Sequence, residues 1–259
     1  MSGELARLLA FAHELADVAD GIALGVYRGE LAVRSKPDAT LVTRADTEIE
    51  ATLRERIMTA YPGHGLVGEE YGTESGEATW RWVIDPIDGT HNFVRGIPIF
   101  GTLIGLARDD DVVVGVASAP ALTSRWWAAR GEGAHRRDST GALPIRVSAI
   151  TPLAAAQVCF PSLRGIEAAG LGDALRTTVR GAWRDRGFGD FWAHMLVAQG
   201  SAEVMVEVGV KPWDMAAPYA IVTEAGGRMT DHAGNDSWTS RNILTTNGHV
   251  HDELLALLR

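Results

Sequence analysis

Apolar residues recur at intervals of three and four along the first part of the chain. This spacing is typical of an amphipathic helix and predicts one over residues 3–28. The apolar residues with this spacing are Leu5, Leu8, Ala12, Leu15, Ala19, Ile22 and Val26. A second apolar series, Ile49, Leu53 and Ile57, predicts another helix that ends at Pro62-Gly63.

Shorter apolar or alternating runs, typical of β-strands, follow in the middle of the chain. Residues 99–107 and 112–118 predict a hairpin around an acidic turn, and 125–129 and 144–148 predict further strands. In the second half we predict a strand at 156–160, a helix at 170–180, a strand at 183–187, a helix at 190–200 and an alternating segment at 202–208. Helices and strands thus alternate, as in α/β proteins.

The most informative segment is WVIDPIDGT at 82–90. Pro86 fixes its own φ, lacks an N–H and biases Asp85 toward an extended conformation. The expected result is a stiff turn with Asp85 and Asp88 on one side, followed by Gly89 and Thr90 at a helix start that suits a phosphate. Two carboxylates beside a phosphate cradle suit a pair of Mg²⁺ ions, although an ordinary surface turn uses the same residue types.

Two other segments place carboxylates near predicted element ends. Glu69 and Glu70 are adjacent in a glycine-flanked turn, where like charges repel unless one meets a cation; alternatively, one is solvated and the other caps. Asp214 is a candidate N-cap of the Ala-rich helix that ends near Gly226-Gly227, and an N-cap Asp also places a carboxylate at the helix mouth, where a metal and a phosphate would sit. Pro218 would remove an early hydrogen bond of this helix, so the sequence does not fix its first residue to better than a few positions.

A third segment, LVTRAD at 41–46, has the spacing of a capping box. Thr43 and Asp46 would together cap a helix that runs to about Tyr61. This structural role alone is enough to explain both residues.

Taken in order, LVTRAD, GEE at 68–70, WVIDPIDGT, PWD at 212–214 and EAGG at 224–227 resemble the inositol monophosphatase family. The resemblance covers Lys36 to Asn247, and DPIDGT with PWD is its specific pair of motifs. Members are Mg²⁺-dependent phosphomonoesterases that share a fold with fructose-1,6-bisphosphatase. Within the family, residues 121–134 and 187–203 are most similar to bacterial histidinol-phosphatases.

The resemblance implies an architecture and an activity. The expected fold is a layered α-β-α-β-α sandwich with two sheets among helix pairs, in one domain over 1–259 with halves near 1–150 and 151–259. The expected reaction is the hydrolysis of histidinol phosphate in histidine biosynthesis. The alternative is an inositol monophosphatase or another sugar or nucleotide phosphatase of the family.

The resemblance also implies a metal site for two or three Mg²⁺ ions. Glu69, Asp85 and the Ile87 carbonyl would hold the first ion, and Asp85, Asp88 and Asp214 the second, with Asp85 bridging. Glu69 would also act through a third, weaker ion.

The catalytic residues implied by the resemblance are Thr90, Asp46 and Glu69. Thr90, hydrogen-bonded to Asp46, would orient the attacking water and help to deprotonate it. The N–H groups of Gly89 and Thr90 would receive phosphate oxygens.

The resemblance also implies which residues bind the substrate. The implied substrate-binding positions are Asp88, Gly89, Thr90 and Asp214, with the organic half of the substrate near Arg186, Gly189, Asp190 and Glu207. A carboxylate at Asp190 favours a cationic substrate such as histidinol phosphate, unless Asp190 merely caps the 190–200 helix. His91 either touches the substrate or lies on the surface, and His194, on an apolar helical face, is expected in the core.

Composition and charge agree with a small-molecule phosphatase. The chain has 259 residues, 46% of them hydrophobic, which is enough for a substantial core. The net charge of −9 argues against nucleic acid as a partner and suits Mg²⁺ and a cationic substrate. A non-catalytic scaffold of this fold would be expected to lack some of the metal-facing carboxylates, and none is missing.

Cellular location and assembly follow from weaker signals. The single cysteine, Cys159, excludes an internal disulfide and suits the cytoplasm. No apolar run approaches the ~20 residues of a membrane span, so we expect no membrane association. The resemblance implies a homodimer that acts on a small phosphomonoester.

Overall fold

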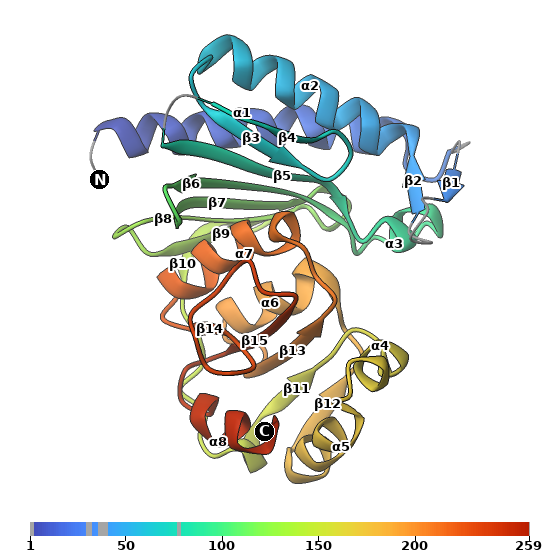
Figure 1. Ribbon diagram of the computed structural model, residues 1–259, viewed down its shortest axis with the longest axis vertical. Coiled ribbons are helices and arrows are strands. Elements are labelled where there is room, and N and C mark those ends of the chain that lie inside the picture. Colours follow the sequence, from blue (N-terminus) through green and yellow to red (C-terminus); the bar gives the residue numbers. More distant parts are fainter. Residues whose placement is uncertain (1–2, 30–32, 36–40, 77–78, 259) are drawn as a thin grey trace.

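Two β-sheets, one of eight strands and one of five, form the frame of the computed structural model (Figure 1). The structure describes residues 3–29, 33–35, 41–76 and 79–258. Lys36, where the family resemblance begins, lies outside the described residues. Helices cover the outer face of each sheet and fill the space between the sheets, so the predicted α-β-α-β-α layering is confirmed.

The larger sheet is antiparallel except for one parallel pair, β3 with β5. Its strands, in spatial order, are β10 (Gly141–Ile145), β9 (Ala134–Asp138), β8 (Ser124–Ala129), β7 (Asp111–Ala119), β6 (Gly101–Arg108), β5 (Trp80–Asp88), β3 (Gly65–Gly68) and β4 (Gly72–Glu74). The predicted hairpin around the acidic turn is β6–β7. The strand predicted at 144–148 occurs earlier, at β10, because β9 and β10 form a hairpin that the charged sequence of β9 did not indicate.

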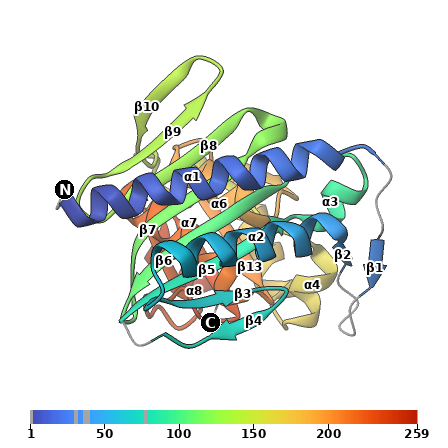
Figure 2. The ribbon, with the colours of Figure 1, turned by 90° about the horizontal axis from the view of Figure 1, so that it is seen from above.

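Two long helices, α1 (Gly3–Val26) and α2 (Arg44–Ala60), cross the outer face of this sheet (Figure 2). The buried stripe of α1 consists of leucine and alanine, which lets the helix approach the strands closely. A capping box starts α2: the Thr43 N–H donates to Asp46 Oδ2 at 2.8 Å, and the Ala45 N–H donates to Thr43 Oγ1 at 3.1 Å. A short strand pair, β1 (Val33–Ser35) and β2 (Leu41–Thr43), precedes α2, and the short helix α3 (Thr90–Val94) follows β5.

The middle layer contains α6 (Asp190–Ala198) and α7 (Pro212–Glu224). A Cβ atom added to Gly105 in β6 would lie 2.7 Å from Ala216 Cβ, and one added to Gly115 in β7 would lie 2.6 Å from the Ala217 carbonyl oxygen. The two glycines therefore allow α7 to lie directly on the larger sheet. Pro218 lies inside α7 and does not interrupt it.

The smaller sheet has the order β12 (Arg184–Arg186), β11 (Gln157–Cys159), β13 (Val204–Val208), β15 (Asn242–Thr246) and β14 (Arg228–Asp231). Its outer face is covered by α4 (Leu163–Ala168), α5 (Gly172–Gly181) and α8 (His251–Leu258), three helices where a pair was expected. The pattern did not predict α4, a helix of six residues. Short 3₁₀ turns occur at Pro120–Leu122 and Leu153–Ala155. No helix in the described ranges has both the length and the apolar character needed to cross a membrane.

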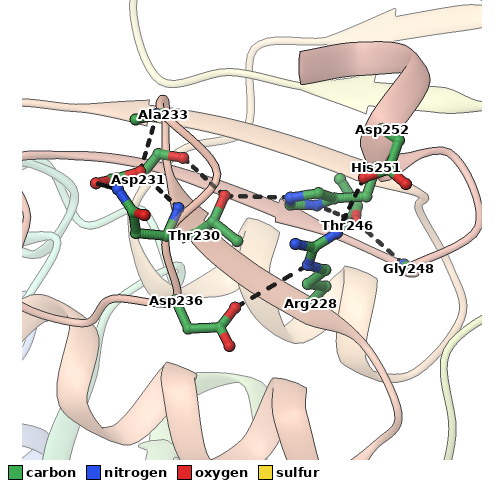
Figure 3. A network of polar contacts seen from close by, with 10 residues as sticks. Arg228, Thr230, Asp231, Ala233, Asp236, Thr246, Gly248, His251 and Asp252 are labelled. Atoms are coloured by element: carbon green, nitrogen blue, oxygen red, sulfur yellow. Dashed lines mark hydrogen bonds and ion pairs between the residues drawn. The ribbon is translucent and has the colours of Figure 1, made fainter. Parts of the chain in front are cut away.

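A polar network fastens α8 to the smaller sheet (Figure 3). His251 is fully buried; its Nε2 lies 3.1 Å from Thr230 Oγ1 on β14, and its Nδ1 lies 2.9 Å from Thr246 Oγ1 on β15. Arg228 pairs with Asp252 at 3.0 Å. Burial, with a smaller effect of the Arg228 charge, lowers the pKa of His251 to about 4.

We expect Gly105→Ala to destabilise the protein by roughly 1–3 kcal/mol, because the added methyl must displace α7 or the strand. Gly21→Ala is a matched control, since Gly21 is an exposed residue of α1 with nothing within 4 Å of an added Cβ. That change should be neutral or stabilising by up to about 1 kcal/mol. Urea unfolding measures both variants, and equal stabilities would contradict the close packing of α7.

The His251 network predicts a pH dependence of stability. Because the pKa of His251 is lower in the folded chain than its ordinary value of 6.5, the unfolded chain binds the extra proton first as pH falls. The contribution of His251 to stability is present above pH 6.5 and is lost as the pH falls toward about 4. In chemical denaturation at pH 7 and pH 5, His251→Gln should lose less stability than wild type over this interval. His249 is exposed, so the control variant His249→Gln should lose as much stability as wild type between pH 7 and pH 5. An equal loss in His251→Gln would refute the assignment.

Candidate active site

The C-terminal end of β5 opens into a cavity of about 540 Å³ that residues from both halves of the chain line. The first half contributes the β3–β4 turn and the β5–α3 junction, and the second half contributes the starts of α6 and α7 and the segment before β15. Five acidic side chains line this cavity: Glu69, Asp85, Asp88, Asp190 and Asp214.

A bulge at the end of β5 places the first two carboxylates. Asp85 pairs with Leu103 of β6 while Asp88 pairs with Gly101, so β5 has one residue more than its partner at this point. Thr102 Oγ1 donates to the Pro86 carbonyl at 2.8 Å and holds the bulged strand. Asp85 and Asp88 both line the cavity as a result, although they are three residues apart.

The third carboxylate arrives on α7. Asp214 is the third residue of this helix, and its Oδ2 accepts the Lys211 N–H at 2.8 Å. The alternative in which Asp214 is the N-cap is therefore wrong, because Lys211 occupies that position. Asp85, Asp88 and Asp214 each offer an oxygen, and these atoms lie within 4.8 Å of one another.

Burial, and after it repulsion from neighbouring carboxylates, raises the pKa of these acidic groups. Burial, followed by repulsion from Glu69, Asp88 and Asp214, raises the pKa of Asp85 well above its ordinary value. Burial, followed by Asp190 and Asp214, does the same for Asp88, and chiefly burial raises the pKa of Asp214 to about 7. The fold thus holds together acidic groups that repel one another.

A divalent cation fits this set of donors. Asp85 Oδ1 is buried and has no hydrogen-bond partner within the described part of the chain. Carboxylate and carbonyl oxygens are the ligands that Mg²⁺ prefers, and the carbonyl-bearing Ile87 lines the same cavity. Glu69 also lines it and lies close enough to influence both Asp85 and Asp214. The five predicted metal ligands therefore meet at one place.

Thr90 and Asp46 adjoin this cluster. Thr90 Oγ1 lies 2.9 Å from the Ile87 carbonyl oxygen and 3.4 Å from Asp46 Oδ1, and its single proton can go to only one of them at a time. Asp46 Oδ2 accepts hydrogen bonds from the Thr43 N–H and hydroxyl, the latter at 2.5 Å. The capping box therefore also holds the carboxylate that faces Thr90.

Asp190 lines the cavity and does not cap α6. The N-cap of α6 is Gly189, and the Phe191 N–H of the first turn donates to Asp88 Oδ2 at 2.6 Å. The capping alternative for Asp190 is therefore wrong. Asp190 adopts φ 55°, in the left-handed region that aspartate tolerates better than most residues. Its Oδ2 lies 3.4 Å from Asn92 Nδ2. Burial raises the pKa of Asp190, and His91 lies close enough to offset part of this effect.

Asp88, Gly89, Thr90 and Asp214 line the cavity, but the three other residues predicted for the organic half of the substrate do not. Arg186 lies in β12, where its Nη1 donates to the Asp185 carbonyl, and Gly189 packs against Pro161. Glu207 is buried on β13 behind the cavity, where burial and then Asp190 raise its pKa well above the ordinary value. The substrate roles of these residues remain predictions.

His194 lies in the core, next to Glu207. Its Nδ1 is 2.9 Å from Thr245 Oγ1, and its Nε2 is 3.9 Å from Glu207 Oε2. Burial lowers the pKa of His194 to about 3. His194 is therefore neutral at physiological pH, as the apolar helical face suggested.

Two basic residues at the cavity were missed by the sequence reasoning as site residues. Lys211 directly precedes the PWD motif, so its place at the mouth of α7 could have been found from that adjacency. Arg241 has no local motif. It reaches the cavity because the Val210 N–H donates to the Arg241 carbonyl at 3.0 Å, which fixes a distant segment beside the start of α7.

Comparison with known proteins identifies relatives that match nearly the whole chain. A histidinol-phosphatase of Streptomyces coelicolor is 43% identical over 96% of both chains, and one of Mycobacterium tuberculosis is 42% identical over 96% of this chain and 97% of the relative. Among solved structures, the extragenic suppressor protein suhB of Bartonella henselae has a TM-score of 0.89 at 29% identity, over 98% of each chain.

The model of the inositol monophosphatase family matches residues 4–259. The resemblance predicted from the motifs, including the nearer similarity to bacterial histidinol-phosphatases, is confirmed. The chain belongs to the inositol monophosphatase family and is a phosphatase.

Proposed function

We propose that this phosphatase is Mg²⁺-dependent and hydrolyses histidinol phosphate to histidinol and phosphate. The observation that carries the proposal is the meeting of Asp85, Asp88 and Asp214 within 4.8 Å in a cavity that Asp190 also lines. The names of the two bacterial relatives, at 43% and 42% identity, support this choice of substrate over inositol phosphate.

Mg²⁺ would be held by Glu69, Asp85, the Ile87 carbonyl, Asp88 and Asp214, and it would neutralise charge on the phosphate and on the leaving oxygen. Side chains and backbone N–H groups of the chain would bind the phosphate, position the attacking water and recognise the substrate. The N–H groups of Gly89 and Thr90 serve as donors to phosphate oxygens, as the family resemblance implies. Both residues line the cavity with the carboxylates, so a phosphate bound to them would lie close to the metal-holding groups.

Thr90 and Asp46 would handle the attacking water. Thr90 Oγ1 donates toward the Ile87 carbonyl or Asp46, so its lone pairs remain able to accept a hydrogen bond from the water. A proton that leaves the water can pass through the hydroxyl to Asp46 Oδ1. Because Thr43 holds the other oxygen of Asp46, this geometry is fixed before the substrate arrives.

Asp190 would recognise the organic half of the substrate. Its carboxylate is not used to cap α6, and it lines the same cavity as the phosphate-facing groups. The ammonium and imidazolium groups of histidinol phosphate offer the charge that such a carboxylate binds, whereas inositol offers only hydroxyl groups. Glu207, buried on β13, lies close enough to Asp190 for that carboxylate to raise its pKa.

The direct test is phosphate release from histidinol phosphate and inositol 1-phosphate, with Mg²⁺ and with EDTA. We expect activity only with Mg²⁺ and a kcat/KM at least ~10-fold higher for histidinol phosphate, the lower bound for one hydrogen bond to a charged group. Equal or reversed preference would favour an inositol monophosphatase, and full activity in EDTA would contradict the Mg²⁺ requirement.

Asp85→Asn should reduce kcat by roughly 100-fold or more while the fold persists. The amide removes a charge from the centre of the cluster and weakens binding of the cation, whose contribution to the barrier is several kcal/mol. Steady-state kinetics at saturating Mg²⁺, with circular dichroism to check the fold, measure the effect. Asp173→Asn, on the exposed side of α5, is the control. Near-normal turnover of Asp85→Asn would rule out the proposed site.

Asp190→Asn should lower kcat/KM for histidinol phosphate by roughly 10–150-fold, the value of one hydrogen bond to a charged group. Asparagine also tolerates a positive φ, so the backbone at this position is retained. Hydrolysis of inositol 1-phosphate, measured on the same preparation, should change little because the groups that face the phosphate are untouched. An unchanged ratio of the two kcat/KM values would remove Asp190 from substrate recognition.

A further inference from the structure

A buried carboxylate lies beneath the turn that carries Glu69. Glu50, on α2, has no exposed surface, and its Oε2 accepts the Glu70 N–H at 2.7 Å. Its Oε1 accepts the Tyr71 N–H at 3.1 Å. One side chain therefore binds two successive backbone N–H groups that directly follow Glu69.

Gly68, the residue before Glu69, shows how closely the turn approaches α2. A Cβ atom added to Gly68 would collide with the Glu50 carboxylate. Only glycine leaves room for that carboxylate at the end of β3. The family motif GEE thus begins with a residue whose missing side chain admits Glu50.

Arg54 completes this arrangement one helical turn later. Its Nε donates to Glu50 Oε1 at 2.9 Å, its Nη2 donates to the Gly72 carbonyl, and its Nη1 lies 3.5 Å from Glu74 Oε2. Arg54 neutralises the buried charge of Glu50 and binds the far end of the turn. Residues 68–74 are therefore held by two adjacent turns of one helix.

The same helix also carries Asp46, one turn before Glu50. Asp46 faces Thr90, whereas Glu50 lies under the turn that bears Glu69. Successive turns of α2 thus hold two separate parts of the site, and the spacing between them is that of a rigid helix.

We propose that Glu50 is a positioning residue for the metal site, acting through the backbone of residues 69–71 to hold Glu69 at the cavity. This inference rests on the proposed function, because it assigns Glu50 to the Mg²⁺ ligand set without making it a ligand. Groups that orient metal ligands typically change metal affinity by about 10–100-fold when they are removed.

Glu50→Gln is the sharpest variant because it keeps the shape of the side chain. The two N–H groups meet different oxygens of Glu50, so an amide can satisfy only one of them and presents its NH₂ to the other. Glu48→Gln is the matched control: Glu48 is on the same helix, about half exposed, in an i,i+4 pair with Arg44.

Titration calorimetry with Mg²⁺ alone and amide hydrogen exchange test the proposal. We expect Glu50→Gln to raise the Mg²⁺ Kd roughly 10–100-fold and to speed exchange at Glu70 and Tyr71, with Glu48→Gln as wild type. The activity that Glu50→Gln loses at low Mg²⁺ should return at high Mg²⁺. If Glu50→Gln does not fold, Arg54→Lys, which keeps the charge but not the bond geometry, should raise the Kd in the same direction.

The outcomes separate two failures. A wild-type protein that binds no Mg²⁺ would overturn the proposed function and this inference with it. A wild-type protein that binds Mg²⁺, together with folded Glu50→Gln of unchanged affinity, would overturn the inference alone. Unchanged affinity in Arg54→Lys would do the same where Glu50→Gln does not fold.

Discussion

Repulsion among buried carboxylates is the constraint on which this structure depends. Asp85, Asp88 and Asp214 offer oxygens within 4.8 Å of one another, and burial raises the pKa of each. Such a cluster is costly to desolvate without a cation. The surrounding elements must therefore hold the acidic groups in place against their own repulsion: the β5 bulge holds two of them and α7 holds the third.

The close packing of α7 on the larger sheet connects the two halves of the chain at this point. Gly105 and Gly115 present no side chains to α7, and alanines of the helix approach the strands at these two positions. Asp214, near the first turn of α7, is thereby brought to the end of β5, although the two segments are more than a hundred residues apart in sequence. On the opposite face of the same sheet, α2 holds Asp46 and the turn that bears Glu69. The site is therefore assembled by helices on both faces of one sheet.

Local sequence signals predicted the parts of the site that local physics determines. The capping box at Thr43 and Asp46 depends on neighbouring residues only, so the sequence was enough to predict it. The stiff turn predicted at Asp85-Pro86 is instead a bulge within β5, which depends on pairing with β6. The layered fold came from the family resemblance, because periodicity indicates elements but not how sheets stack. The roles of the individual site residues stay predictions until they are tested.

Features that depend on distant contacts could not be predicted in this way. Asp190 stands in the sequence where a helix cap would be expected. In the structure, Asp88 of β5 accepts the Phe191 N–H in the first turn of α6. Glu50 has the spacing of a polar surface residue on an amphipathic helix, and only the approach of the β3–β4 turn buries it. Arg241 reaches the cavity through a backbone contact with Val210, which no local motif indicates. The charged strand β9 forms because it pairs with β8 and β10, not because its own residues favour a strand.

We propose that a divalent cation relieves the repulsion within the acidic cluster. Thermal unfolding of the wild-type protein at increasing MgCl₂, against NaCl of equal ionic strength, tests it most directly. Because a ligand that binds only the folded state stabilises it by RT ln(1 + [L]/Kd), the unfolding midpoint should rise steadily with Mg²⁺ and far less with NaCl. A midpoint that responds equally to both salts would contradict the account.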